Sequence, residues 1–243
     1  MHRSKSEQTQ WVRKERRDAC CSNLSLPHNV KQGFKRQYYY GHGASVITRS
    51  EFQDIINLEG QVRGSTLNTD AAYIESRGGR DGLRTVQETF RQLGYPVDYK
   101  HIKDMGWYPV CLRVLSLRVI QDVFDLKNDG IIDMGDTAPK FSFIVKVFMK
   151  FTGMPEHALA RIPEYWRMHY SIGDIRVDEV NERAGYLVVQ LGSFKIHPIL
   201  CRYFEGYFRR LLQFSFVTQE VRSRETKCAF NGAPYHEYHI AWK

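Results

Sequence analysis

The chain has 243 residues, of which 42% are hydrophobic and 13% aromatic, a composition typical of a globular protein rather than a disordered one. Its formal net charge of +8 is concentrated at the N-terminus, where residues 1–37 hold nine Lys or Arg and three Asp or Glu. The rest of the chain is close to neutral, which argues against a nucleic-acid-binding domain. We expect a basic arm over residues 1–40, with nucleic-acid binding as its weaker alternative, and a single domain over residues 41–243.

The sequence has no stretch of about 18 uncharged apolar residues, the length that a membrane helix needs. The first residues also lack the apolar core of a signal peptide, and we therefore expect a cytoplasmic protein without a membrane span. The five cysteines are an odd number, which does not indicate the paired disulfides of a small secreted domain. Cys111, Cys201 and Cys228 could therefore bind a metal or simply be buried.

The first half of the chain shows the apolar spacing of helices. After a short strand over residues 43–49, we expect helices over residues 51–58, 81–93, 109–124, 139–151 and 155–170. Ser50 is the expected N-cap of the first helix, and Gly94 is expected to end the second. The apolar side chains of residues 109–124 go round the whole helix, which predicts a central, buried position.

The periodicity changes after residue 173. Residues 174–180 and 186–191 are rich in β-branched side chains and are joined by a turn ending at Gly185, which predicts an antiparallel hairpin. A helix is expected from Pro198 onward, followed by strands over residues 214–222 and 235–242. This order predicts an α+β fold, with a helical first half packed on an antiparallel sheet of at least four strands arranged strand-strand-helix-strand-strand.

Four side chains of metal-ligand type lie near the C-terminus. Glu225 stands three residues before Cys228, and Gly232 permits a tight reversal that brings Cys228 towards His236. Cys201, near the start of the last helix, can supply a fourth donor, and the resulting ligand set fits tetrahedral zinc. Because neither a C-x-x-C nor an H-x-x-x-H spacing is present, the residues alone leave open whether the cysteines hold a metal or are simply buried.

The run from Cys228 to His236, C-A-F-N-G-A-P-Y-H, resembles the closing signature of 4-vinyl-reductase domains, in which a Cys, a Gly and a second Cys precede the final strand. The related sensor domains of phenol- and xylene-responsive activators hold zinc with an upstream Cys, a Glu, a second Cys and a terminal Cys. The resemblance, strongest over residues 172–243, implies a structural zinc site at Cys201, Glu225 and Cys228, with His236 in place of the terminal Cys.

The resemblance also implies a sensor or carrier domain that binds a small apolar or aromatic molecule between the central helices and the sheet, and that acts as a homodimer. The candidate ligand-binding residues are Trp107, Phe148, Trp166, His169 and Tyr170. The alternative from a different class is a scaffold or tethering subunit with a filled core and a purely structural metal.

Haem binding and catalysis are weaker alternatives. The same superfamily includes haem-based nitric oxide sensors, but their Tyr-x-Ser-x-Arg signature is absent, and His169 is the one helical candidate for an axial ligand. The sequence has no Gly-rich phosphate loop, G-x-S-x-G or H-E-x-x-H motif, and four protein ligands close a zinc site against substrate. We therefore expect no enzymatic activity.

Overall fold

The structure is a computed structural model, and it describes residues 47–142, 145, 159–216 and 220–243. The helices in chain order are α2 (Arg49–Ile56), α3 (Gly64–Gln92), α4 (Val110–Val123), α5 (Asn128–Phe141), α8 (Ile162–His169) and α9 (Pro198–Phe216), with the short 3-10 helices η1 (Tyr99–His101) and η2 (Ala229–Asn231). The strands are β1 (Gln61–Arg63), β2 (Trp107–Pro109), β3 (Asp174–Asn181), β4 (Tyr186–Gly192), β5 (Val221–Lys227) and β6 (His236–Trp242). Within the described ranges, every helix is too short or too polar to cross a membrane.

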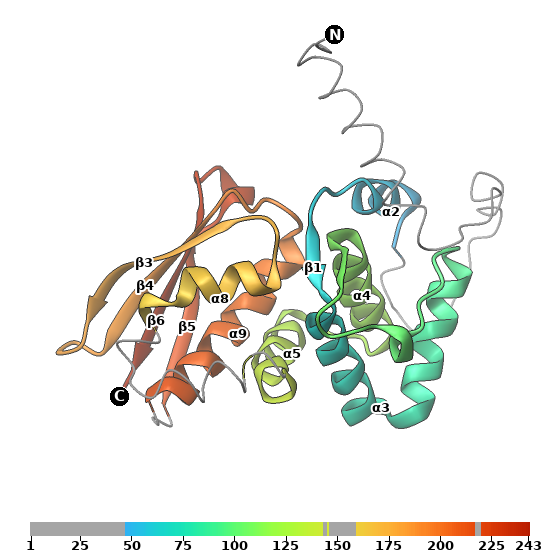
Figure 1. Cartoon of the computed structure of the whole chain (residues 1–243), viewed down its shortest axis with the longest axis horizontal. Coiled ribbons are helices and arrows are strands. Elements are labelled where there is room, and N and C mark those ends of the chain that lie inside the picture. The colour runs from blue at the N-terminus through green and yellow to red at the C-terminus, as the bar shows by residue number, and fades with distance from the viewer. Residues whose placement is uncertain (1–46, 143–144, 146–158, 217–219) are drawn as a thin grey trace, which may run out of the picture.

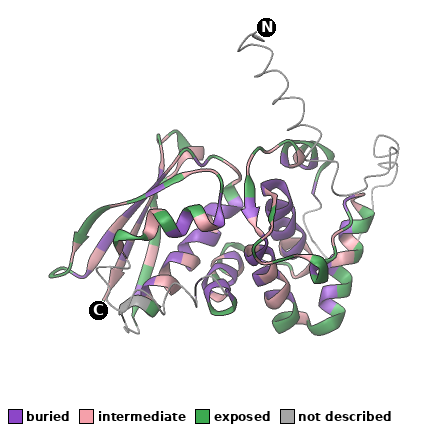
Figure 2. Ribbon diagram, viewed as in Figure 1, coloured by how far each residue is buried: buried purple, intermediate pink, exposed green. Residues whose placement is uncertain are grey.

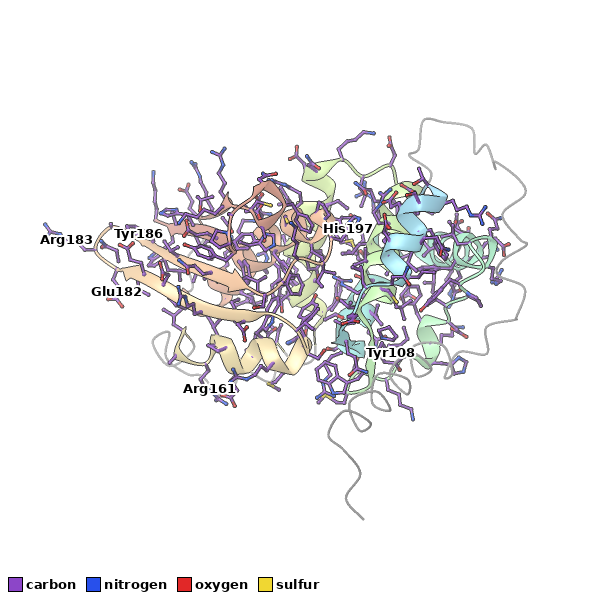
Figure 3. The ribbon with its side chains drawn as sticks, turned by 90° about the horizontal axis from the view of Figure 1, so that it is seen from above. Tyr108, Arg161, Glu182, Arg183, Tyr186 and His197 are labelled. Carbon is purple, nitrogen blue, oxygen red and sulfur yellow. The ribbon has the colours of Figure 1, made fainter. Side chains whose placement is uncertain are left out.

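Strands β3 to β6 form an antiparallel sheet in the order β3-β4-β6-β5, which confirms the predicted α+β fold and its strand-strand-helix-strand-strand order. Helix α9 packs along β5 and β6, and α8 packs beside β3. Helices α2, α3 and α4 form the opposite half of the molecule, and α5 lies between the two halves (Figure 1). The β3–β4 turn, marked by Glu182 and Arg183, projects from the end of the sheet that is farthest from the helical half (Figure 3).

Helix α4 is the centre of the helical half, as its all-round apolar pattern predicts. Every residue from Val110 to Ile120 is buried, and Figure 2 shows this helix buried along most of its length. The buried run includes two arginines, Arg113 and Arg118. Because arginine is almost never fully buried without a partner, these two positions indicate polar contacts inside an otherwise apolar core.

Helix α3 consists of two helical segments, because the backbone of Gly79 has the non-helical angles φ 60° and ψ −156°. The segment after Gly79 agrees with the predicted helix over residues 81–93, whereas the segment from Gly64 to the kink was not predicted. The beginning of α2 also differs, because the N-cap is Thr48 rather than Ser50, and its hydroxyl accepts a hydrogen bond from the backbone N–H of Glu51. Residues 43–46 of the predicted first strand lie outside the described residues.

Two further predicted boundaries are wrong. Pro139 lies in the last turn of α5 rather than at the start of a new helix, and most of the segment predicted as helix 139–151 lies outside the described ranges. Helix α9 continues to Phe216, so the next strand runs from Val221 to Lys227 instead of over residues 214–222. A short apolar and aromatic run fits a helix end as well as a strand, which explains the second error.

Helices α5 and α9 cross with their backbones in direct contact. A Cβ atom on Gly206 would stand 1.8 Å from the carbonyl oxygen of Ile132, and one on Gly135 would stand 1.9 Å from that of Tyr203. Both obstacles are backbone atoms, which cannot move aside as a flexible side chain can. The two glycines therefore fix the position of α9, and with it Cys201, relative to the helical half.

Candidate functional site

The four predicted metal ligands meet where β5 ends and β6 begins. Cys201 lies at the N-terminal end of α9, Glu225 in β5, Cys228 directly after β5, and His236 at the first position of β6. Their ligand atoms all lie within 4.8 Å of one another, and we call these residues the four-donor cluster. The chain reverses between the last two at Gly232, whose φ of 90° favours glycine, as the sequence predicts.

The spacing of the sulfur and nitrogen atoms suits a tetrahedral metal site. Two sulfur ligands on bonds of about 2.3 Å would lie about 3.8 Å apart at the tetrahedral angle, and a sulfur and an imidazole nitrogen about 3.6 Å apart. The sulfur atoms of Cys201 and Cys228 lie 3.8 Å apart, and the Cys201 sulfur lies 3.7 Å from Nδ1 of His236. The cluster thus has the dimensions of an ion-binding site without any rearrangement of its sulfur ligands.

The hydrogen bonds of His236 require a proton or a cation between this residue and Glu225. Its Nε2 lies 2.9 Å from the backbone carbonyl oxygen of Phe194, and a carbonyl can only accept, so Nε2 carries the hydrogen. Its Nδ1 therefore has a free lone pair, and it lies 2.8 Å from a carboxyl oxygen of Glu225. A proton on one of the two groups or a metal ion must lie between these atoms, and an imidazole that donates its other N–H to a backbone carbonyl is the usual arrangement of a metal ligand.

Two charged residues of α9 hold Glu225 in place. A Glu205 carboxylate oxygen accepts a hydrogen bond from the backbone N–H of Glu225 at 3.0 Å. Arg202 donates to Glu205 at 2.8 Å and lies 3.6 Å from the Glu225 carboxylate. Such contacts orient the ligands of a metal site.

Because the four-donor cluster is buried, a net negative charge in it is unfavourable unless a cation is bound. The side chains of His236 and Glu225 are only 2% and 3% exposed. Burial raises the pKa of the Cys201 thiol, and the nearby Glu225 carboxylate raises it further. The hollow between Cys201, His236 and His197 is too narrow for a water-sized molecule, so no water fits between these three side chains. Without a metal ion, Cys201 is therefore a neutral thiol.

Two of the predicted ligand-binding residues belong to a packed group of rings. Trp166 and Tyr170 stack with their ring centroids 4.6 Å apart, and Phe194 and Phe204 pack against both of them at centroid distances between 5.3 and 6.1 Å. We call these four residues the aromatic cluster. All four are buried, and the indole N–H of Trp166 donates to the carbonyl oxygen of Ile172 at 2.9 Å. In the described structure, these rings fill the space that the sequence predicts as a pocket.

The other predicted pocket residues lie elsewhere or cannot be placed. Trp107, in β2, is 37% exposed and stacks beneath the guanidinium of Arg63 at 3.8 Å, which is a surface arrangement. Phe148 lies outside the described residues. His169, the last residue of α8, is buried next to Tyr165, at a ring-centroid distance of 4.5 Å. The structure therefore brings together Trp166, His169 and Tyr170 on one short segment, without Trp107.

His169 is a neutral imidazole with one nitrogen unused. Its Nδ1 lies 3.0 Å from the carbonyl oxygen of Tyr165 and therefore donates to it, whereas its buried Nε2 has no hydrogen-bond partner among the described residues. Burial lowers the pKa of His169 to about 4, and the charge of Arg63 lowers it further, against the opposing effect of the Tyr165 carbonyl. A buried nitrogen lone pair of this kind can accept a proton or bind a metal.

Sequence reasoning missed two residues that the structure places at the centre of these contacts. Phe194 belongs to the aromatic cluster through its ring and supports His236 through its carbonyl oxygen. Arg113 is completely buried and forms an ion pair with Asp70. The available signal for Arg113 was a charged residue within an apolar helix, whereas a backbone contact such as that of Phe194 leaves no trace in the residue type.

No protein-family model matches the sequence, and no curated protein matches it. Solved structures do share its fold, and H-NOX domains are among them. An H-NOX protein from S. oneidensis in the Fe(II)NO ligation state is 13% identical, with a TM-score of 0.57 over 74% of this chain and 99% of that one. An oxygen binding H-NOX domain related to soluble guanylate cyclases is 14% identical, with a TM-score of 0.54 over 74% of this chain and 95% of that one. At these identities the likeness establishes the fold alone.

This comparison corrects two predictions. The chain has the fold of H-NOX domains, so its predicted assignment to the 4-vinyl-reductase domains and their zinc-containing sensor relatives was wrong. The predicted zinc cofactor was also wrong by the same comparison, because the proteins that share the fold include one in an Fe(II)NO ligation state and one whose heme is distorted by the protein. A nine-residue signature with one altered ligand was too short to distinguish between domains of similar architecture.

The described residues fit haem in one respect only. The unused Nε2 of His169 has the protonation state that an axial ligand needs. The rings of Trp166 and Tyr170, on the same segment, are packed against Phe204 and are not open to a ligand. Among the described residues, the structure therefore provides a nitrogen donor for haem, and the aromatic cluster does not provide an open site for the porphyrin, which needs a pocket of roughly 300–1,000 Å³ or more.

Proposed function

We propose that this chain is a small-ligand-binding sensor domain whose C-terminal sheet is fastened to α9 by a metal ion in the four-donor cluster. One observation carries the proposal: the four donor atoms lie within 4.8 Å of one another. They come from α9, β5, the β5–β6 connection and β6. A bound cation would supply the charge that separates the nitrogen of His236 from the carboxylate of Glu225. Since the ion would join α9 to two strands, its binding would contribute directly to the folding free energy.

The cluster predicts the chemistry of the ion but not its identity. Two thiolates and one imidazole favour divalent transition metals over Mg²⁺ or Ca²⁺, which prefer oxygen ligands. Four protein ligands leave no open coordination position, so we propose a structural role for the ion and no catalysis at this site. A homodimer and a cytoplasmic location also remain proposals.

Metal analysis of the purified chain tests the site. We expect about one equivalent of a transition metal, and addition of Co²⁺ to chelator-treated protein should produce the visible absorption of thiolate-bound cobalt. Cys228→Ser should abolish that absorption and lower the melting temperature. Cys111→Ala is the matched control, because Cys111 is buried in α4 and lies outside the cluster. A metal-free preparation whose stability does not respond to Co²⁺ would overturn the site.

The sensor part of the proposal is supported by the fold and by unsatisfied polar atoms inside it. The domains that share the fold include an oxygen binding H-NOX domain. In the described part of this chain, buried nitrogen atoms of Arg113 and His169 lack hydrogen-bond partners. Such atoms are rare in folded proteins, and a bound molecule would satisfy them. Native mass spectrometry tests this part, since a small molecule that co-purifies with the chain supports a sensor and a bare chain supports a scaffold.

Haem is the second candidate ligand, and the unused Nε2 of His169 is the observation that favours it. If haem binds, His169 would be its axial ligand, and the aromatic cluster would have to open to admit the porphyrin. Absorption spectra of the protein after reconstitution with haemin test the idea, with His169→Ala as the variant. A Soret band that is the same in both proteins, or a spectrum of free haemin in both, would refute axial ligation by His169.

A further inference from the structure

The guanidinium of Arg113 lies at the seam between the two halves of the molecule. It belongs to α4, and it contacts α3 through Asp70 and the backbone of Thr66. On the other side, the ring of Tyr203 in α9 lies 4.5 Å from the guanidinium carbon. Arg113 is fully buried, so it is a charged group enclosed by three helices.

Only part of this guanidinium is used. Its Nη1 pairs with Asp70 and lies 3.4 Å from the carbonyl oxygen of Thr66. The other oxygen of Asp70 accepts from Ser116 at 2.7 Å, and Ser116 contacts the hydroxyl of Tyr99 at 2.7 Å, so the carboxylate is held in place. In contrast, Nε and Nη2 of Arg113 are buried and make no hydrogen bond of standard geometry with the described residues, although the Tyr170 hydroxyl is close enough to the guanidinium for a weaker hydrogen bond that lowers the pKa of Tyr170. These two nitrogens lie on the same edge of the planar group.

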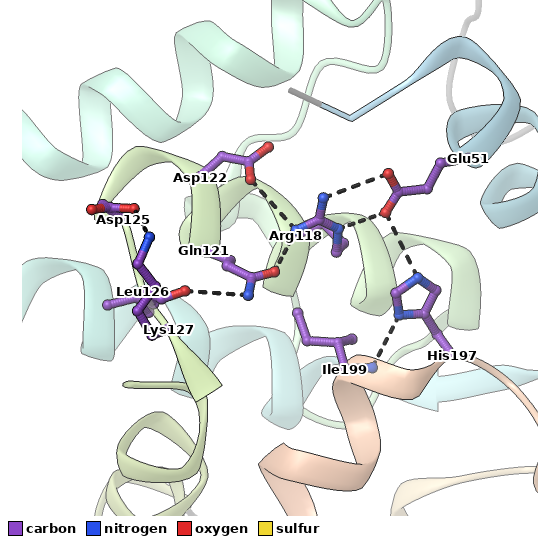
Figure 4. Close-up of polar contacts among 9 residues, drawn as sticks. All are labelled: Glu51, Arg118, Gln121, Asp122, Asp125, Leu126, Lys127, His197 and Ile199. Atoms are coloured by element: carbon purple, nitrogen blue, oxygen red, sulfur yellow. Dashed lines mark hydrogen bonds and ion pairs between the residues drawn. The ribbon is translucent and has the colours of Figure 1, made fainter. Parts of the chain in front are cut away.

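A second arginine of the same helix has the hydrogen bonds expected of a purely structural residue. Arg118 donates through Nε to Glu51 at 2.6 Å, through Nη1 to Gln121 and Asp122, and through Nη2 to Glu51 again (Figure 4). His197 joins the same network, with Nε2 3.8 Å from Glu51. The fold therefore satisfies Arg118 on all three nitrogens, and the two unsatisfied nitrogens of Arg113 are a feature of that position.

The guanidinium of Arg113 has aromatic neighbours. Burial raises the pKa of Tyr170 and that of Tyr203, and the charge of Arg113 opposes this effect at both residues. Tyr170 is a member of the aromatic cluster, so the guanidinium adjoins the rings that the sequence predicts as the wall of a pocket. Because these rings are packed together in the described structure, a molecule bound here would have to displace them, and it would then place its polar end on Arg113 and its apolar body among aromatic side chains.

We propose that the seam at Arg113 is a binding subsite for the carboxylate of a small aromatic acid. Two parallel N–H groups on one edge of a guanidinium match the two oxygens of a carboxylate, and the planar group and its adjoining rings suit a flat ligand. This inference rests on the proposed small-ligand function and names the class of ligand.

The charge balance at Arg113 predicts a second effect of carboxylate binding, the uptake of a proton. The Arg113–Asp70 pair is neutral, so a bound carboxylate would add one buried negative charge. The charged and titratable groups around Asp70 are Arg113 from α4, Tyr99 from η1, Tyr170 after α8 and Tyr203 from α9, with Ser116 as a hydrogen-bond donor. Burial raises the pKa of Asp70, against the opposing effects of Arg113 and Ser116, which makes this residue the expected acceptor of a proton as the carboxylate enters. Proton uptake on binding would make the affinity higher at lower pH.

Calorimetric titration of the metal-loaded full chain with sodium benzoate tests the subsite, and benzyl alcohol serves as the uncharged analogue. Benzoate should bind more tightly than benzyl alcohol, with proton uptake detected as a dependence of the heat on the buffer. The double variant Asp70→Asn with Arg113→Met removes the pair together and so leaves no unpaired buried charge. It should weaken benzoate by at least about tenfold, as expected for loss of a charge-assisted pair of hydrogen bonds, and leave benzyl alcohol unchanged.

Arg118→Met is the matched control, because it removes a buried arginine from the same helix without touching the subsite, and it should leave benzoate affinity unchanged. The proposal is overturned if benzoate binds no more tightly than benzyl alcohol, or if the double variant keeps its affinity for benzoate. Binding of benzyl alcohol alone would overturn the subsite and leave the small-ligand function standing. Binding of neither probe counts against both.

Discussion

The buried imidazole of His169 predicts a specific loss of stability in acid. In the folded chain the pKa of His169 is lowered to about 4 from an ordinary value of 6.5. The unfolded chain therefore takes up a proton at this residue as the pH falls below about 6.5, while the folded chain does not until about pH 4. The stability that depends on the neutral form is thus complete above pH 6.5 and is lost as the pH falls through 6.5 towards 4.

The size of the effect follows from the two pKa values. Each unit of difference corresponds to about 1.4 kcal/mol, so the full loss below pH 4 is about 3 kcal/mol. At pH 5 the unfolded chain is almost fully protonated at His169 and the folded chain is not, which gives about 2 kcal/mol relative to pH 7. Against a typical domain stability of 5–15 kcal/mol, this is a measurable fraction.

Urea unfolding at pH 7 and pH 5, in preparations without haem absorption, measures the effect. The free energy of unfolding of the wild-type chain should fall by about 2 kcal/mol more than that of His169→Gln, whose amide does not titrate. His101→Gln, which replaces a histidine whose side chain is 85% exposed, is the matched control for the loss of one imidazole. The reasoning is refuted if wild type and His169→Gln lose the same free energy between the two pH values.

Two further predictions concern the contacts that position the four-donor cluster. Gly206→Ala should lower the free energy of unfolding by about 3 kcal/mol or more, because its Cβ would stand 1.8 Å from a backbone oxygen of α5. Gly192→Ala, whose nearest contact would be 3.8 Å away, should stay within about 1 kcal/mol of wild type, and equal losses would contradict this account of the helix crossing. Glu205→Gln should weaken metal binding about 10- to 100-fold through Glu225, as measured by competition with a chelator, and an unchanged affinity would count against a supporting role.

Much of the fold was predictable because its signals are local. The all-round apolar pattern of α4 predicts its burial, and the β-branched runs joined at Gly185 predict the β3–β4 hairpin. The boundaries were less predictable, because the aromatic run at the end of α9 fits a helix as well as a strand. The kink at Gly79 divides α3 into two segments, and the apolar spacing in the sequence indicated only the second of them.

The convergence of the four donors was predictable from residue types, since carboxylate, thiol and imidazole groups near a glycine turn have a limited range of positions. Their assignment to a family was wrong, because a short signature carries little information about the rest of a fold. The state of Arg113 could not be predicted, because its partner Asp70 lies on another helix and its unsatisfied nitrogens depend on tertiary packing. The sequence can indicate that a buried arginine is present, but only the structure shows which of its N–H groups lack a hydrogen-bond partner.

Phe194 gives the two candidate sites a common residue. Its ring packs against Trp166 and Tyr170, next to the seam at Arg113, and its carbonyl oxygen orients His236 in the four-donor cluster. A ligand that shifts the ring would also change the backbone on which His236 depends. Thermodynamic linkage then requires reciprocity, so the factor by which the metal ion changes ligand affinity must equal the factor by which the ligand changes metal affinity. Binding of the ligand would thereby change the affinity of the chain for the metal ion, and binding of the metal ion would change its affinity for the ligand.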